Sequence, residues 1–112
     1  MADVTVIAAV RRFLQALRGR GLPVQFGLVF GSHASGSAGE WSDIDVLVVS
    51  SRFDEDYDYE DVALMWRVAA ATDSRIEPVP CGLREWRAGR GRAIVEAARR
   101  AGEPVEIAEA SA

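Results

Sequence analysis

Apolar side chains change their spacing several times along this chain, and each spacing predicts a different element. Near the N-terminus they recur three and four positions apart, as on one face of an α-helix, at Ile7, Val10, Leu14 and Leu17. Asp3 precedes this repeat as a candidate helix N-cap, and Gly19 follows it as a terminator. We therefore expect a packing helix that runs from Asp3 to about Arg18.

Two apolar runs without helical spacing come next, and both predict strands. Val24–Phe30 is apolar on both faces, which is typical of a strand in the centre of a sheet. Asp43–Ser50 is the second run, and the segment between them, Gly31–Gly39, is rich in glycine and serine. Because that segment is too short for a full crossover helix, we expect the two strands to pair antiparallel.

The second half of the chain alternates between helical and strand patterns. A helix is expected from about Glu60 to Thr72, with Val62, Met65, Trp66 and Ala69 on its packing stripe. It is followed by a strand over Arg75–Pro80. The two prolines of that strand remove backbone donors, which predicts an edge position in the sheet. The remaining expected elements are a helical turn, a helix and a short strand, at Leu83–Ala88, Arg92–Ala101 and Glu103–Ala108. We expect the helix to pack through Ile94, Val95 and Ala98. This order predicts an α/β (α+β) fold, in which a small mixed sheet of three to four strands packs against helices.

Composition narrows the class of protein. The chain has 112 residues, which suits a single domain over residues 1–112 with its core at about residues 5–108. Cys81 is the one cysteine, and no apolar run approaches the roughly 20 residues that span a bilayer, so we expect a cytoplasmic protein without membrane contact. A net charge of −4 argues against sequence-independent nucleic-acid binding.

Acidic residues in an apolar segment are the first indication of a functional site. Asp43 and Asp45 stand two positions apart at the start of a strand, where alternate side chains share a face and like charges repel. A hard divalent cation would relieve that repulsion, and Glu77 on the next strand could supply a third oxygen ligand. Upstream, Gly31 allows close backbone approach to a phosphate, and Ser32 offers a hydroxyl group or a helix cap. This combination is typical of phosphoryl or nucleotidyl transfer.

These residues match a known signature. Gly31-Ser32, Gly36 and the run from Ser42 to Val48 (SDIDVLV) together resemble the signature of the DNA polymerase β-like nucleotidyltransferases, and the length resembles their minimal form. The resemblance implies that Mg²⁺ or Mn²⁺ is bound by Asp43, Asp45 and Glu77. It also implies that ATP or another nucleoside triphosphate places its phosphates over Gly31 and Ser32. A nucleoside monophosphate would then pass to a protein or small-molecule acceptor.

The resemblance also implies a partner. Minimal members of the family are often paired with a HEPN-domain protein, so this chain would be the antitoxin of such a pair, within a homo- or hetero-oligomer. The alternative is an inactive module with the same fold, which docks to a partner through apolar helix faces or the arginine-rich C-terminal third. Nucleic-acid polymerisation is disfavoured because so short a chain has no further subdomain to hold a duplex.

Three positions qualify the interpretation. Many minimal members carry a basic residue where this chain has Ser35, so a phosphate-neutralising charge is missing unless His33 or a C-terminal arginine replaces it. The third acid is usually aspartate, whereas Glu77 is one methylene longer, and both departures predict reduced activity or none. Trp41 stands beside the acids, where it could stack on a base, contact a lid or pack within the fold.

Overall fold

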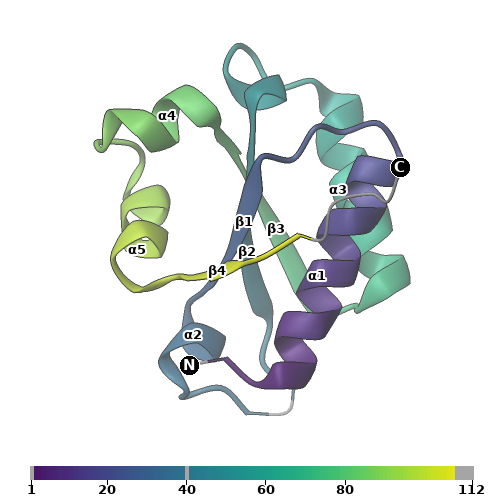
Figure 1. Cartoon of the computed structure of the whole chain (residues 1–112), viewed down its shortest axis with the longest axis vertical. Coiled ribbons are helices and arrows are strands. Elements are labelled where there is room, and N and C mark those ends of the chain that lie inside the picture. The colour runs from purple at the N-terminus through teal and green to yellow at the C-terminus, as the bar shows by residue number, and fades with distance from the viewer. Residues whose placement is uncertain (1, 40, 108–112) are drawn as a thin grey trace.

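The computed structural model describes residues 2–39 and 41–107, and over these residues the chain forms a four-stranded sheet between two layers of helices (Figure 1). The elements in chain order are α1 (Val4–Gly19), β1 (Phe26–Phe30), α2 (Ser32–Ser35), β2 (Ile44–Ser50), the 3-10 helix η1 (Ser51–Phe53), α3 (Tyr59–Thr72), β3 (Ile76–Gly82), α4 (Leu83–Ala88), α5 (Ala93–Ala101) and β4 (Glu103–Val105). The predicted α/β class with a small mixed sheet is therefore confirmed.

The sheet has the strand order β3-β2-β1-β4, and its pairing follows from the lengths of the connections. β1 is antiparallel to both β2 and β4, which confirms the pairing expected from the short loop between the first two strands. β2 and β3 are parallel, and α3 provides the crossover between them. β3 lies at the edge as predicted, and Pro78 and Pro80 are two residues apart, so both missing donors fall on its outer side.

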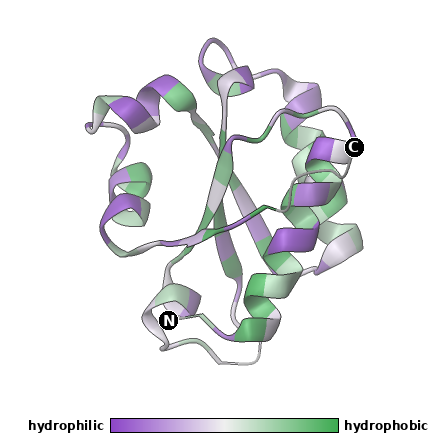
Figure 2. Cartoon of the chain, viewed as in Figure 1, coloured by the Kyte–Doolittle hydropathy of each residue, from purple (hydrophilic) through white to green (hydrophobic). Residues whose placement is uncertain are grey.

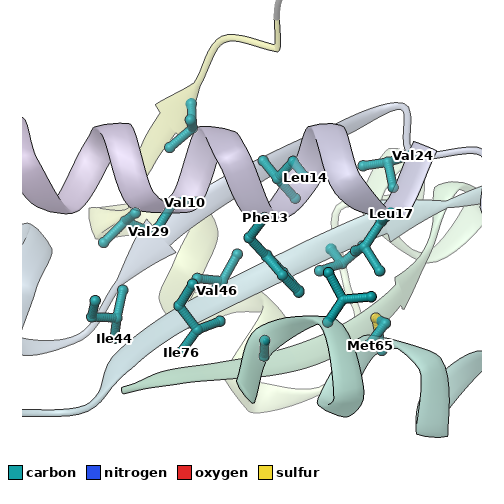
Figure 3. Close-up of a cluster of buried hydrophobic side chains, with 14 of the residues drawn as sticks. Val10, Phe13, Leu14, Leu17, Val24, Val29, Ile44, Val46, Met65 and Ile76 are labelled. Carbon is teal, nitrogen blue, oxygen red and sulfur yellow. The ribbon is translucent and has the colours of Figure 1, made fainter. Parts of the chain in front are cut away.

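One helical layer consists of α1 and α3, which cover the same face of the sheet. Asp3 caps α1 as expected, because its carboxylate accepts a hydrogen bond of 2.7 Å from the Thr5 backbone N–H. Phe13, Leu14 and Leu17 point from α1 toward the strands and are fully buried (Figure 3). The strands contribute alternate residues to this core, namely Val29, Ile44, Val46, Val48 and Ile76.

The other layer consists of α4 and α5, and it covers the opposite face less completely. Val95 and Ala98 of α5 are buried against a second set of strand residues, Leu28, Phe30, Leu47 and Val49. The expectation that Ile94 also packs is wrong, because this side chain is 40% exposed. In Figure 2 β1 and β2 are mostly hydrophobic in colour whereas α4 is mostly hydrophilic, as suits a short helix with much of its surface in water.

Several element boundaries differ from the expected ones by a few residues. β1 begins at Phe26 rather than Val24, and β2 begins at Ile44, so that Asp43 stands just before the strand. β4 ends at Val105, and the expected end at Ala108 lies outside the described residues. No helix in residues 2–39 and 41–107 is long and apolar enough to cross a bilayer.

Cys81 gives a direct test of this packing. Its side chain is fully buried, and loss of hydration raises the pKa of the thiol to about 12. The thiolate is the reactive form, and at about pH 8 only about one thiol in 10,000 would be ionised. We expect Ellman's reagent to leave the native protein unmodified over minutes and to titrate one thiol after denaturation in guanidinium chloride. Rapid reaction of the native protein would contradict the buried position.

Candidate active site

Two of the three predicted acids are direct neighbours across the sheet. Asp45 is the second residue of β2, and the strand register pairs it with Glu77 on β3 and with Phe30 on β1. Paired residues on adjacent strands project from the same face, so Asp45 and Glu77 share the face that α4 and α5 cover farther along the strands. Asp43 precedes β2 by one residue and is exposed. The fold therefore brings together Asp43 and Glu77, although they lie 34 positions apart in the sequence.

The electrostatics of these acids show that they act on one another. Partial burial raises the pKa of Asp45, and the negative charge of Asp43 raises it further. Loss of hydration also raises the pKa of Glu77, with additional contributions from the charges of Asp43 and Asp45 and from a hydrogen bond with Asp43. The charge of Asp43 therefore makes ionisation of Asp45 and Glu77 less favourable, and a cation bound between these carboxylates would stabilise their ionised forms.

The chemistry of the donors suits a hard divalent cation. In the part of the chain that the structure describes, no group of three or more His, Cys, Asp and Glu side chains is arranged to hold a metal ion. Mg²⁺ commonly uses only one or two carboxylates and completes its shell with water and substrate phosphates. Asp43 and Asp45 fit a cation of this kind, one that is held jointly by the protein and a bound triphosphate.

Gly31 occupies a position that only glycine can fill. It follows β1 and caps α2 with φ 73° and ψ −149°, a region that other residues almost never adopt. A Cβ atom at this position would lie 2.4 Å from Oδ2 of Asp45, well inside van der Waals contact. The bare backbone of this turn therefore lies directly against one of the predicted metal-binding carboxylates.

We expect Gly31→Ala to damage the site more than the fold. The strained backbone should cost about 1–3 kcal/mol in the free energy of unfolding, and the new methyl group should displace the Asp45 carboxylate. Gly36→Ala is the matched control, since Gly36 also has a positive φ of 80° but an added Cβ would meet nothing within 4 Å. Urea denaturation should show a loss of stability in both variants, and Mg²⁺-dependent ATP binding should fall only in Gly31→Ala. Equal nucleotide binding by the two variants would contradict this role for Gly31.

The rest of the Gly-Ser turn is held by its own hydrogen bonds. Ser32 is the first residue of α2 and Gly31 is its cap, so the interpretation of Ser32 as a helix cap is wrong. The Ser35 hydroxyl donates to the Ser32 carbonyl at 3.1 Å and lies 2.8 Å from the Ser37 hydroxyl. Ser35 stands where many minimal members of the family that the sequence resembles carry a basic residue, and here it holds the loop by hydrogen bonds instead of providing positive charge.

His33 has a role that sequence reasoning did not find. Its side chain is only 7% exposed, and its Nε2 lies 3.0 Å from the backbone carbonyl of Ser42. A carbonyl can only accept, so Nε2 carries the proton, and the bond ties α2 to the residue that precedes Asp43. The one signal in the sequence was that His33 is the only bulky residue in a loop of small ones. Its burial argues against His33 as the replacement for the missing phosphate-binding charge.

The chain belongs to the nucleotidyltransferase domain family, whose pattern matches residues 10–86. That span covers more than half of the 112 residues and includes Gly31, Ser32, Asp43, Asp45 and Glu77. The search of curated proteins returned no significant match.

Solved structures share the fold at low sequence identity. A putative nucleotidyltransferase from Sulfolobus solfataricus is 18% identical with a TM-score of 0.58, and the match covers 76% of this chain and 74% of that one. A toxin–antitoxin structure with AMP-PNP is 20% identical with a TM-score of 0.60, covering 88% of this chain and 74% of that one. A mutant of the toxin–antitoxin MntA-HpeT is 17% identical with a TM-score of 0.58, with the same coverage of 88% and 74%. These likenesses support the nucleotidyltransferase fold.

Proposed function

We propose that this chain is a minimal nucleotidyltransferase that transfers a nucleoside monophosphate, in the first instance AMP from ATP, to a protein or small-molecule acceptor. The observation that carries the proposal is the contact between two halves of one site. The glycine turn at Gly31 lies against Asp45, and Asp45 is paired in register with Glu77. A phosphate-binding turn beside a carboxylate cluster is the equipment that transfer of a nucleotidyl group requires.

In this proposal each residue has a separate task. Asp43 and Asp45 would hold Mg²⁺ or Mn²⁺, which when bound neutralises the triphosphate and polarises its α-phosphorus. Gly31 lets the backbone approach the phosphates, and the Ser32 hydroxyl donates to a phosphate oxygen. Glu77 stands across from Asp45 and would accept the proton of the attacking hydroxyl group, which its raised pKa favours. The acceptor oxygen then bonds to the α-phosphorus, and pyrophosphate leaves.

Position-specific labelling of ATP tests the reaction type. The purified chain is incubated with Mg²⁺, a cell extract as a pool of acceptors, and ATP labelled at either the α- or the γ-phosphate. Nucleotidyl transfer predicts that the α-label enters the acceptor and that the γ-label leaves as pyrophosphate. Protease and nuclease treatment then identifies the class of acceptor. Transfer of the γ-label instead would show phosphoryl transfer and would reject the proposed function.

We also propose a HEPN-domain toxin as the protein partner, with this chain as its antitoxin. The similar solved structures include toxin–antitoxin complexes, one with AMP-PNP and one of a mutant in which two aspartates two positions apart are replaced by glutamate. That spacing is the spacing of Asp43 and Asp45. Under this proposal the acceptor is the toxin itself, and modification silences it.

A second candidate function, a binding module without catalysis, is favoured by the outer face of α3. Tyr59 is 80% exposed and Trp66 is 47% exposed, and seven positions bring them to one side of the helix. The expectation that Trp66 lies on the packing stripe is wrong, since Met65, Val68 and Ala69 form the buried face. Large aromatics on one exposed face are typical of a protein-docking surface.

Coexpression with a HEPN-domain toxin separates the two functions. If neutralisation of the toxin is catalytic, it should be lost in Asp43→Asn/Asp45→Asn and kept in Tyr59→Ser/Trp66→Ser when docking uses another surface. If the chain acts by docking through α3, the pattern should reverse. Retention of neutralisation in the aspartate variant would therefore reject catalysis as the mode of action.

A further inference from the structure

Trp41 is the most exposed large apolar side chain near the candidate active site. It is 85% exposed, although it stands directly before Ser42 and Asp43. Packing within the fold was one interpretation of this residue from the sequence, and the exposure shows that it is wrong. An indole left in water forgoes the stabilisation that burial would give it, so it is available to a ligand.

The backbone next to Trp41 is firmly held, although its side chain is in water. The Ser42 backbone N–H donates to the Gly39 carbonyl at 3.2 Å, and the Gly39 N–H donates to the Ser42 hydroxyl at 3.0 Å. The Ser42 carbonyl accepts the third bond, from Nε2 of the buried His33 at 3.0 Å. The residue after Trp41 is thus fixed by its backbone and by its side chain, so the indole projects from an anchored point.

That anchored point lies next to Asp43 of the proposed site. One residue, Ser42, separates Trp41 from Asp43, so their Cα atoms are at most about 7 Å apart even in an extended chain. Gly31, Asp45 and Glu77 complete the site beside Asp43. A nucleoside triphosphate whose phosphates meet the glycine turn and the acids has its base outside this cluster, where an exposed aromatic ring can reach it.

Stacking would add binding affinity that the charged groups of the site do not provide. Ser35 provides no positive charge, and His33 is buried and bonded to Ser42, so neither side chain adds a positive charge to the hydrogen bonds that the turn offers to phosphates. Base–aromatic stacking provides affinity that does not depend on charge, and it accepts every base because each has a flat π-face. An exposed tryptophan beside an acidic metal site would supply affinity that the loop lacks.

We propose that Trp41 binds the nucleobase of the substrate by stacking, so that the base is held by the indole and the triphosphate by the turn and the acids. This inference rests on the proposed nucleotidyl transfer and adds a binding residue to it. It also predicts weak discrimination between ATP and GTP, since stacking reads the face of a base and not its edge.

Calorimetry with two ligands isolates the base from the phosphates. Wild type, Trp41→Ala and Trp41→Phe are titrated in Mg²⁺ with AMP-PNP and with inorganic tripolyphosphate, which has no base. We expect Trp41→Ala to weaken AMP-PNP binding about tenfold to a hundredfold and to leave tripolyphosphate binding unchanged. Trp41→Phe should recover most of the loss. Val4→Ala, which removes an 82% exposed side chain from α1, is the control and should bind both ligands normally.

Fluorescence gives an independent readout because the chain has three tryptophans. In a Trp66→Phe/Trp86→Phe background only Trp41 emits, and AMP-PNP should quench it whereas tripolyphosphate should not. The inference is overturned, and the proposed function left intact, if Trp41→Ala has unchanged affinity for AMP-PNP. The same holds if Trp41→Ala loses affinity equally for AMP-PNP and for tripolyphosphate. If wild type binds tripolyphosphate but not AMP-PNP, the stacking inference is rejected and the proposed function is not. If it binds neither ligand, the proposed function fails and the inference fails with it.

Discussion

Asp45→Asn should abolish nucleotidyl transfer and leave the protein at least as stable as wild type. The amide keeps the shape of the side chain but lacks the negative charge that would bind the cation in the proposed reaction. A bound metal contributes several kcal/mol to the transition state, so a loss of about 4 kcal/mol corresponds to about a thousandfold fall in kcat. Label transfer from α-labelled ATP under single-turnover conditions measures this fall.

Electrostatics determines whether the same variant is more or less stable than wild type. Burial and the charge of Asp43 raise the pKa of Asp45, so the folded state gains stability when this group is protonated and loses it as the pH rises through that pKa. At neutral pH the ionised carboxylate therefore disfavours folding, and a neutral amide removes the penalty. We expect the Tm of Asp45→Asn without metal to equal or exceed that of wild type.

Asp56→Asn is the matched control for this variant, since it makes the same chemical change at an exposed position of the acidic segment between β2 and α3. It should leave transfer unchanged. If the proposed site binds Mg²⁺ in the folded state, Mg²⁺ should raise the Tm of wild type and of Asp56→Asn, and should raise that of Asp45→Asn much less. Full activity in Asp45→Asn would exclude this carboxylate from the reaction. A large fall in its Tm would show instead that Asp45 supports the fold.

Phe13→Ala should be among the most destabilising single changes in this chain. The ring is fully buried between α1 and the sheet, in the hydrophobic cluster that also contains Leu17 and Met65 (Figure 3). Removing a buried phenyl ring forfeits its transfer free energy and leaves a cavity, which together cost about 3–5 kcal/mol. That is a large share of the stability of a domain of this size.

Urea denaturation followed by circular dichroism measures the loss. Val4→Ala is the control on the same helix, and because Val4 is 82% exposed its effect should stay within about 0.5 kcal/mol. A loss below about 1 kcal/mol in Phe13→Ala would mean that the core around α1 collapses into the cavity or is looser than the structure shows.

Local sequence patterns were sufficient to predict those elements whose form depends on a short segment alone. The spacing in α1, the apolar runs of β1 and β2 and the prolines of β3 each report a property of a short segment, so each could be interpreted without knowledge of the fold. Trp66 and Ile94 show where this fails. Both fit a helical stripe, yet which stripe faces the core depends on where the helix docks.

Such patterns do not predict contacts between distant segments. Gly27 is an unremarkable strand glycine in the sequence, but a Cβ atom there would lie 2.7 Å from Cδ1 of Leu14, so its absence lets α1 sit close to the sheet. His33 likewise looked like a loop residue, and only the bond to Ser42 shows that it anchors the start of β2.

Residue type and spacing alone predicted the fold class, the family and the candidate acids, because the Gly-Ser turn and the Asp-x-Asp segment are contiguous and carry their chemistry locally. How these parts meet depends on the packing of distant segments. The register paired Asp45 with Glu77, the backbone at Gly31 came against Asp45, and Trp41 was left in water. These three outcomes depend on strand pairing and on steric contact between segments, which no local pattern encodes.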